Sequence, residues 1–307
     1  MCATLYLLTG PTAAGKSALA LEWARAHGAE ILSCDALQVY RGMDIGTAKP
    51  GAAERAQVRH HGLDLCDPAV PYSVAAYRDY AVKAVEGIHA RGHAALVVGG
   101  SGFYLKSFFA PVADEVAISP EIEAEVRELE KSGGLDALVE RLRAASPEGT
   151  GAVDLRNPRR VGRALARCLA SGRSVPELAA AFAQRGTPFD RWDKRLVRLE
   201  RSAEDLQARI RARTRHMLEG GLVDEVRALT AALRANPAAG SAIGYRETLA
   251  WLEASGSAPL AELEESIARH TLQLVKKQHT WFRTQLPEHR TINLSEEPVA
   301  GGGDLFA

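Results

Sequence analysis

The stretch that decides the fold is Gly10-Pro11-Thr12-Ala13-Ala14-Gly15-Lys16-Ser17, which matches the phosphate-binding pattern G-x-x-x-x-G-K-[ST] at every fixed position. An apolar run of strand length precedes it at residues 3–8, and helix-forming residues follow it as far as Gly28. A strand, a glycine-rich turn and a helix in this order predict a loop whose backbone N–H groups surround a polyphosphate. We therefore expect residues 10–17 to bind phosphate groups, with Lys16 neutralising a terminal phosphate and the Ser17 hydroxyl serving as a ligand of Mg²⁺.

The composition restricts the class of protein. The chain has 307 residues, of which 46% are hydrophobic and 25% charged, and its formal net charge is zero. These values are typical of a globular protein, and any surface that attracts nucleic acid must be local. The four cysteines are too far apart in sequence to form a zinc motif, which favours a reducing compartment. No apolar run approaches the roughly 18 residues that span a bilayer, so we expect a cytoplasmic protein without membrane contact.

Two other predicted strands end in residues that suit a ligand site. The strand at residues 29–34 ends at Asp35, and the strand at residues 94–98 leads into Gly99-Gly100-Ser101-Gly102. The carboxyl ends of neighbouring parallel strands face one crevice, so Asp35 is a candidate general base or metal ligand, with a turn or helix cap as the structural alternative. The Ser101 hydroxyl is expected at the same crevice. The acidic Mg²⁺ ligand common in ATPases is absent after residue 98, which disfavours a generic ATPase.

The periodicity changes near residue 112, where helical patterns replace strands. Helix starts at Ser119, Asn157 and Ser174 predict an all-helical domain at 113–190, after which residues 196–199 form a returning strand. We predict an α/β fold with a P-loop NTPase-like parallel sheet and flanking helices, formed by residues 1–112 and 191–295. The tail, 296–307, is expected to be flexible, with Gly301-Gly302-Gly303 disordered.

Local basic surfaces occur in the second half of the chain. Residues 156–173 contain six arginines and no acid, and Arg159, Arg163 and Arg167 share one helix face. A second basic stripe runs along the last predicted helix, at Arg269, Lys276 and Arg283. Such stripes indicate either an ordinary solvated surface or a nucleic-acid interface.

Together these motifs resemble the tRNA dimethylallyltransferase family, also called the tRNA isopentenyltransferase family. The resemblance covers nearly the whole chain, and its most specific part is the run G-M-D-I-G-T-A-K-P. The matching segments are residues 10–17, 35–40, 42–50, 99–104, 157–165, 244–246 and 276–283.

The resemblance implies transfer of a dimethylallyl group from dimethylallyl diphosphate to N6 of adenine A37, beside the anticodon, in tRNAs that read codons beginning with U. It implies Mg²⁺ as cofactor and the tRNA anticodon stem-loop as partner. No self-pairing motif stands out in the sequence, so we expect a monomer. Asp35 matches the family's general base, and Arg213 matches an arginine that contacts the pyrophosphate. Ser101 stands where the family usually has threonine and is expected to be catalytic, with its hydroxyl holding a phosphate oxygen and orienting the site.

The resemblance also implies a set of tRNA-binding residues, which includes Asp35 and Ser101. The set consists of Asp35, Ala36, Leu37, Gln38, Ser101, Arg159, Arg160, Val161, Gly162, Arg163, Gly244, Tyr245 and Arg246. Two positions depart from the family pattern: Ala36 replaces serine, and Lys277 replaces an arginine whose bidentate contacts lysine cannot form.

Three other functions fit parts of this pattern. A small-molecule kinase would use the same phosphate loop, but it leaves the helical insertion without a task. A prenyltransferase acting on free AMP or ADP needs no extended basic surface. A tRNA-binding protein without catalysis leaves the phosphate loop and Asp35 unexplained.

Overall fold

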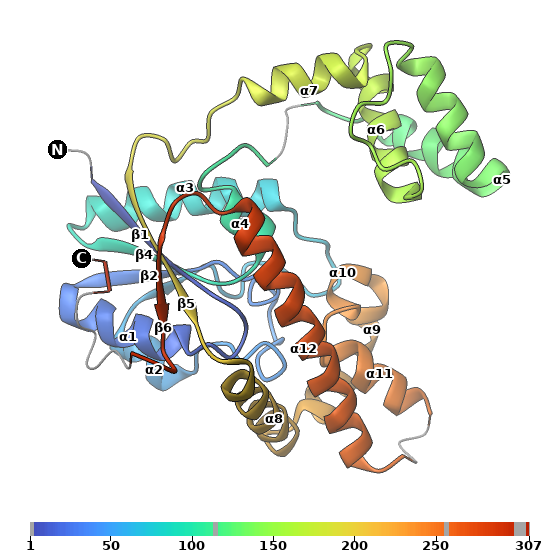
Figure 1. Ribbon diagram of the computed structural model, residues 1–307. Coiled ribbons are helices and arrows are strands. Elements are labelled where there is room, and N and C mark those ends of the chain that lie inside the picture. The colour runs from blue at the N-terminus through green and yellow to red at the C-terminus, as the bar shows by residue number, and fades with distance from the viewer. Residues whose placement is uncertain (1–2, 113–115, 255–257, 298–304, 307) are drawn as a thin grey trace. The chain divides into compact units, whose positions relative to one another are not determined.

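The computed structural model describes residues 3–112, 116–254, 258–297 and 305–306. The chain divides into two compact units, one formed by Met1–Phe109 with Pro188–Ala307 and the other by Ala110–Thr187 (Figure 1). The smaller unit begins and ends three residues before the bounds 113–190 that the sequence predicts for the helical insertion.

The larger unit is organised around a parallel six-stranded sheet with the strand order β3-β2-β4-β1-β5-β6. The central strand β1 pairs on both sides, so that Leu7 lies opposite Val97 of β4 and Leu196 of β5. Apolar runs without polar alternation are typical of parallel strands covered on both faces. The strands are β1 Thr4–Thr9, β2 Ala29–Ser33, β3 His60–His61, β4 Ala94–Val98, β5 Asp193–Glu200 and β6 Arg290–Asn293.

Helices cover both faces of this sheet. Their starts agree with local signals: Ser73 accepts a hydrogen bond from the Ala76 N–H at the start of α3, and Ser202 accepts one from Asp205 at the start of α8. The helices are α1 Lys16–His27, α2 Ala52–Gln57, α3 Val74–Ala90, α4 Gly102–Lys106, α8 Ala203–Glu219, α9 Leu222–Ala235, α10 Pro237–Gly240, α11 Tyr245–Glu253 and α12 Leu260–Gln285. The short elements α2, α10 and β6 were not predicted, because four to six residues carry too little periodicity.

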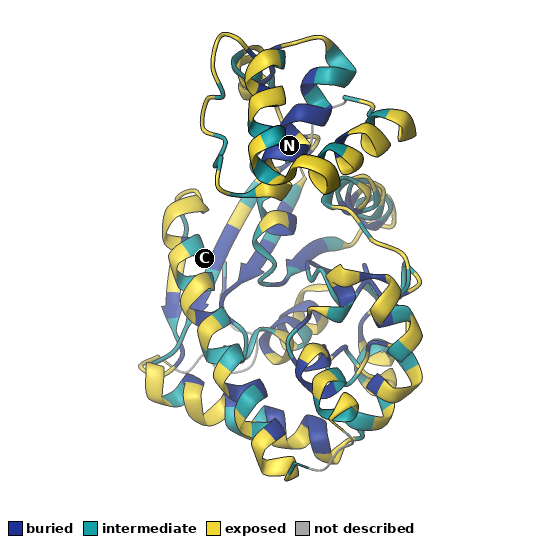
Figure 2. Ribbon diagram, turned by 90° about the vertical axis from the view of Figure 1, so that its right-hand side faces the viewer, coloured by how far each residue is buried: buried dark blue, intermediate teal, exposed yellow. Residues whose placement is uncertain are grey.

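The alternation of side chains along β1 divides the core into two layers. Leu5 and Leu7 pack in the layer that includes Tyr77 of α3, whereas Leu8 packs in the layer that includes Trp23 of α1. Figure 2 shows buried strands inside helices whose outer faces are exposed. The sheet is therefore a rigid base, and its loops at the carboxyl ends of the strands can hold side chains in fixed positions.

The end of the chain differs from the predicted flexible tail at Leu305 and Phe306. Leu305 is fully buried, and the Phe306 ring lies 5.0 Å from the rings of Tyr6 and Trp23. Burial of Leu305 and partial burial of the Phe306 ring hold the segment against α1 and β1. The predicted disordered glycines, 301–303, lie outside the described residues.

The smaller unit consists of helices around its own apolar core. It contains α5 Pro120–Ala145, α6 Pro158–Ser171 and α7 Val175–Ala183, with α5 interrupted by a left-handed residue at Gly134. Val161 and Leu165 of α6 are fully buried in this core. No helix in the described ranges of either unit has the length and apolar character needed to cross a membrane.

Candidate active site

The phosphate loop joins β1 to α1, and glycine is required at its start. Gly10 has a φ of 148°, and a Cβ there would lie 2.5 Å from the Leu199 carbonyl oxygen. Lys16 begins α1, and its Nζ donates hydrogen bonds to the carbonyl oxygens of Gly10 and Pro11 at 2.9 and 2.8 Å. The ammonium group is thus held over the loop, where it can neutralise a bound phosphate.

Two arginines hold the outer side of the same loop. Nε of Arg209 donates to the Ala13 carbonyl oxygen at 2.8 Å, and Nε of Arg201 donates to the Ala14 carbonyl oxygen at 2.8 Å. Arg201 also forms a 2.6 Å ion pair with Asp205. Neither arginine was predicted as a site residue: Arg209 begins the segment 209–217 in which only Arg213 was assigned a role, and only the folded chain brings α8 to the loop.

Lys16, Arg213 and Asp35 form a group of coupled charges. Burial, reinforced by the positive charge of Arg213, lowers the pKa of Lys16 to about 8, and the carboxylate of Asp35 opposes this shift. Burial also lowers the pKa of Arg213, again opposed by Asp35. Two partly buried cations that line the same cavity, with a single nearby carboxylate, favour the binding of a further anion.

Asp35 combines a structural role and a free oxygen. Its Oδ1 accepts hydrogen bonds from the N–H groups of Leu37 at 2.8 Å and Gln38 at 3.4 Å, so the turn predicted as the structural alternative is present. Its Oδ2 makes no hydrogen bond to any described residue. The turn therefore fixes the carboxylate and leaves one oxygen able to accept a proton.

Ser101 connects the loops that follow β2 and β4. Its Oγ accepts a 3.0 Å hydrogen bond from the Ala36 N–H, which leaves the hydroxyl proton available for a ligand. The loops approach closely: a Cβ on Gly99 would lie 2.0 Å from the Cys34 carbonyl oxygen, so only glycine fits there. The structure thus brings Asp35 and Ser101 together at one edge of the sheet.

Gln278 of α12 is a site residue that the sequence reading missed. Its Oε1 accepts the Thr12 N–H at 3.0 Å, and its Nε2 donates to the Gly100 carbonyl oxygen at 3.2 Å. The side chain bridges the phosphate loop and the loop after β4. Its place in the run from Lys276 to Arg283 was the only available signal.

Two cavities meet at this group of residues. The smaller has a volume of about 110 Å³ and contains Lys16 and Ser17 of the phosphate loop. The larger, of about 450 Å³, has a mainly apolar lining that includes Leu274 and Trp281 of α12. The residues that line both cavities are Thr12, Asp35, Thr47, Gly100, Arg213 and Gln278.

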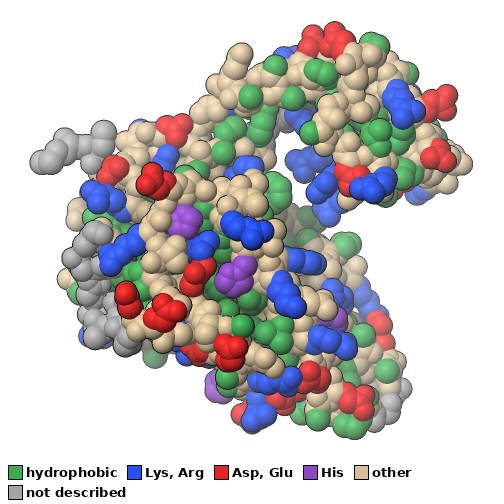
Figure 3. Space-filling model, viewed as in Figure 1, with side chains coloured by type: hydrophobic (Ala, Val, Ile, Leu, Met, Phe, Trp, Pro, Cys, Tyr) green, Lys and Arg blue, Asp and Glu red, His purple; other side chains and the backbone are tan. Residues whose placement is uncertain are grey.

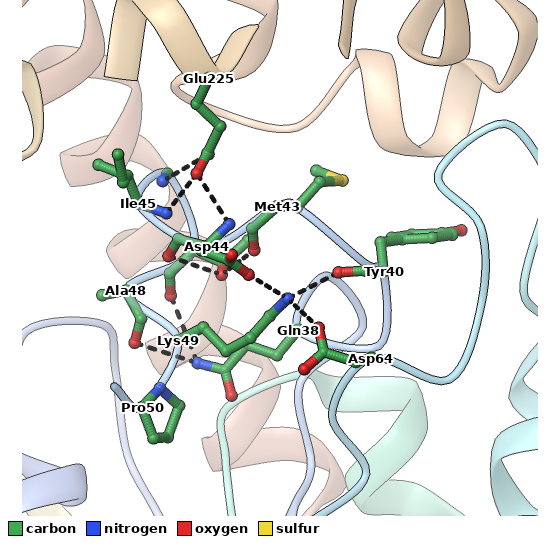
Figure 4. Close-up of polar contacts among 12 residues, drawn as sticks. Gln38, Tyr40, Met43, Asp44, Ile45, Ala48, Lys49, Pro50, Asp64 and Glu225 are labelled. Atoms are coloured by element: carbon green, nitrogen blue, oxygen red, sulfur yellow. Dashed lines mark hydrogen bonds and ion pairs between the residues drawn. The ribbon is translucent and has the colours of Figure 1, made fainter. Parts of the chain in front are cut away.

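The run G-M-D-I-G-T-A-K-P forms a loop that is held by hydrogen bonds to Glu225 and an ion pair with Asp64 (Figure 4). Glu225 of α9 accepts hydrogen bonds from the N–H groups of residues 44, 45 and 46 at 3.0, 2.7 and 3.1 Å. Nζ of Lys49 forms ion pairs with Asp44 at 2.6 Å and Asp64 at 2.7 Å. These contacts fix Thr47, which lines both cavities.

Several residues predicted to contact tRNA have their side chains engaged within the protein. Tyr245 is fully buried and donates a 2.6 Å hydrogen bond to Glu225, so it positions the 42–50 loop. The Gln38 amide accepts from Ser33 and donates to the carbonyl oxygens of Thr47 and Ala48.

In the predicted RNA-contacting segment of the smaller unit, some side chains are buried and others are exposed. Val161 is fully buried, and a Cβ on Gly162 would lie 3.3 Å from Val126, so both belong to the α5–α6 contact. Burial excludes a side-chain contact of Val161 with RNA. Arg159, Arg160 and Arg163 are exposed.

The remaining predicted residues line one of the two cavities, except Arg246, which is in neither lining. Ala36, Leu37 and Gly244 line it, as does Lys277, the position that departs from the family pattern. Arg246 pairs with Glu247 and is half exposed. Ser17 is exposed at the start of α1 and lines the smaller cavity.

The parallel sheet and the glycine-rich loop that leads into α1 define a P-loop NTPase-like protein, with the site at the carboxyl ends of its strands. The sequence profile of the IPP transferase family matches residues 38–285. The chain belongs to this family.

Similar proteins agree with that assignment. A tRNA dimethylallyltransferase of Opitutus terrae is 55% identical over 97% of this chain and 95% of its own, and one of Rhodococcus jostii is 40% identical over 92% and 89%. The crystal structure of a tRNA isopentenylpyrophosphate transferase of Bacillus halodurans has a TM-score of 0.66 and 30% identity over 96% of this chain and 91% of that one.

Proposed function

We propose that the protein transfers a dimethylallyl group from dimethylallyl diphosphate to N6 of A37 in tRNAs that read codons beginning with U. The observation that carries the proposal is the pair of cavities that meet at Asp35 and Arg213. One cavity offers a cationic phosphate loop, and the other offers an apolar space for a nucleobase. The names of the relatives support the same activity.

The residues suit both halves of the reaction. The bond between the allylic carbon and the diphosphate oxygen breaks, and Lys16, Arg213 and the loop N–H groups stabilise the negative charge that develops on the leaving diphosphate. The N6 amine forms the new bond to that carbon and loses a proton, for which the free Oδ2 of Asp35 is the acceptor. Ser101 helps to hold the loop that carries Asp35. The products are the N6-substituted adenine and diphosphate.

A divalent metal fits this site as a partner of the diphosphate. The described residues contain no cluster of three or more His, Cys, Asp or Glu side chains that could bind a metal alone. Ser17 is exposed in the smaller cavity, and Mg²⁺ commonly keeps waters while it binds one protein ligand and phosphate oxygens. We propose Mg²⁺ with Ser17 as its protein ligand, where the ion would neutralise charge on the diphosphate.

The exposed arginines of α6 support a polynucleotide acceptor. Arg159, Arg160 and Arg163 give the smaller unit a basic surface of the kind that binds single-stranded loops through phosphates. We propose that it contacts the anticodon stem-loop and that the enzyme acts as a monomer. A reaction with free AMP or ADP would leave this surface unused.

Mass spectrometry of RNA tests the function directly. Purified protein is incubated with unmodified tRNA, dimethylallyl diphosphate and Mg²⁺, and the RNA is digested and analysed. The expected result is one added isoprenoid unit on A37, with stoichiometric diphosphate. Parallel reactions contain AMP or ADP in place of tRNA, or ATP in place of the allylic donor. Prenylated free nucleotide without prenylated tRNA, or phosphate transfer from ATP, would replace the proposal with one of the alternatives.

A further inference from the structure

Phe103 is the most exposed large apolar side chain among the described residues, and it lies on the rim of the larger cavity. Its exposed fraction is 65%, compared with 53% for Val70 and 48% for Leu260. The next two residues of α4, Tyr104 and Leu105, are buried in the core. The short helix therefore points one aromatic ring outward at the cavity mouth.

The position of this ring is held firmly from below. A Cβ on Gly102 would lie 2.8 Å from the Trp281 ring, so the start of α4 lies directly against α12. Nζ of Lys106 at the other end of α4 donates a 3.2 Å hydrogen bond to Gln285. An exposed aromatic side chain on a fixed backbone loses little conformational entropy when a flat ligand stacks on it.

The charge pattern of the two helices that meet beside Phe103 favours a polyanion as its partner. Residues 266–287 of α12 and the following turn contain no Asp or Glu, and neither do residues 99–113 around α4. The same segments carry Lys106, Arg269, Lys276, Lys277 and Arg283. Lys and Arg side chains recur along the face on which α12 runs in Figure 3. An aromatic ring with Lys106 on its own helix and Lys277 in the lining of the same cavity matches the stacking sites of single-stranded nucleic acids better than an apolar peptide surface.

We propose that Phe103 stacks on the nucleobase next to the modified adenine and thereby stabilises the opened RNA loop. This inference rests on the proposed function. The modified base must leave its stack to bring N6 to Asp35, and its departure exposes a face of each neighbouring base. Phe103 lies at the mouth, outside the region where Asp35 and Arg213 join the two cavities, so it meets a base that remains outside. Stacking there offsets part of the free energy lost on unstacking.

Kinetics with an anticodon stem-loop and a set of Phe103 variants test this proposal. Stacking on an aromatic side chain is worth enough that Phe103→Ala should raise KM for the RNA between about 5-fold and about 150-fold. KM for dimethylallyl diphosphate should change far less than KM for the RNA, because Phe103 does not line the smaller cavity that contains the phosphate loop. Phe103→Trp and Phe103→Tyr should retain the wild-type KM, whereas Phe103→Leu, which is apolar but not aromatic, should resemble alanine. Val70→Ala is the matched exposed control.

A second arm uses stem-loops that lack the base on one side of A37 or the other. With the abasic neighbour that Phe103 contacts, wild-type protein and Phe103→Ala should have the same KM. An equal penalty with both abasic substrates, full function of Phe103→Leu, or an unchanged KM in Phe103→Ala would each overturn the stacking role while transfer by the wild type continues. Absence of transfer by the wild type would instead overturn the proposed function.

Discussion

Oε1 of Gln278 accepts a 3.0 Å hydrogen bond from the backbone N–H of Thr12, although the two residues are 266 positions apart. The same amide donates to the Gly100 carbonyl oxygen. One side chain of the C-terminal helix α12 therefore fixes the distance between the phosphate loop and the loop after β4. Both loops line both cavities, so this bridge also sets the geometry of the place where the cavities meet.

Breaking the bridge should weaken donor binding. Gln278→Leu removes both hydrogen bonds and leaves the Thr12 N–H unpaired, so KM for dimethylallyl diphosphate should rise about tenfold. Gln278→Glu keeps the acceptor but adds a negative charge beside the diphosphate, and it should raise this KM further. Gln285→Leu, a change at the exposed end of the same helix, is the control. A donor KM that stays constant in both Gln278 variants would contradict the bridging role.

Donor binding should weaken as the pH rises through about 8. The pKa of Lys16 is lowered to about 8, so the free enzyme loses this positive charge in the range where a surface lysine keeps it. Measured at donor concentrations below KM, kcat/KM should therefore fall at alkaline pH. Lys16→Arg stays charged and should show a flatter alkaline profile at lower activity.

Deprotonation of Lys16 should weaken donor binding but increase the free energy of unfolding of the ligand-free protein. The folded-state pKa of Lys16 is below its ordinary value of 10.5, so the unfolded chain binds more protons between the two values. The contribution of this group to the free energy of unfolding should increase as pH rises from about 8 towards 10.5. Urea unfolding of wild type and Lys16→Met across this range measures the difference. A contribution that decreases with pH would contradict the lowered pKa.

Removing the proton acceptor should lower the chemical rate and leave the turn intact. Asp35→Asn keeps an oxygen that can accept from the Leu37 N–H but cannot take the amine proton. Single-turnover transfer should therefore slow by roughly 10²- to 10⁴-fold with little change in donor binding. Asp35→Ala should lose the turn as well as the base, so its melting temperature should fall below that of the asparagine variant. Near-normal turnover of Asp35→Asn would remove Asp35 from the base role.

The contact between Glu225 and the 42–50 loop should control the order of that loop. Glu225→Ala leaves three backbone N–H groups without their acceptor; those of the partly buried Ile45 and Gly46 should cost more than that of the exposed Asp44, which water can satisfy. Amide hydrogen exchange at residues 44–46 should accelerate, and transfer should slow because Thr47 lines both cavities. Tyr245→Phe, which removes only one hydrogen bond to Glu225, should cost about 1 kcal/mol. Unchanged exchange in Glu225→Ala would show that the loop is held by its other contacts.

The arginines of α6 should contribute through charge. Arg159, Arg160 and Arg163 replaced together by glutamine should weaken binding of the anticodon stem-loop and flatten its dependence on salt, because fewer counterions are released. Arg127 and Arg141 of α5, which pair with Glu123 and Glu125, provide matched control substitutions in the same unit. Equal affinity and salt slope in the triple variant would exclude this helix from the RNA surface.

Local sequence determined the parts of the protein that depend on neighbouring residues. The glycines and Lys16 of the phosphate loop, the strand that ends at Asp35 and the cap at Asn157 are all set by backbone conformation and hydrogen bonds within a few positions. The apolar runs of β1 and β4 likewise predicted a buried parallel sheet. The sequence predicted these features because they depend on interactions between residues that are close together in the chain.

Tertiary structure alone decided which distant residues share the site and which are buried. Arg209 and Gln278 reach the phosphate loop only after α8 and α12 pack beside it. The segment 276–283 indicated that Gln278 belongs to a motif, but not that it binds the loop. Tyr245 and Val161 lie in motifs that the resemblance assigned to RNA binding, yet both are fully buried. A motif indicates that a position matters. Only packing decides whether the side chain at that position contacts a substrate or instead supports the backbone of residues that do.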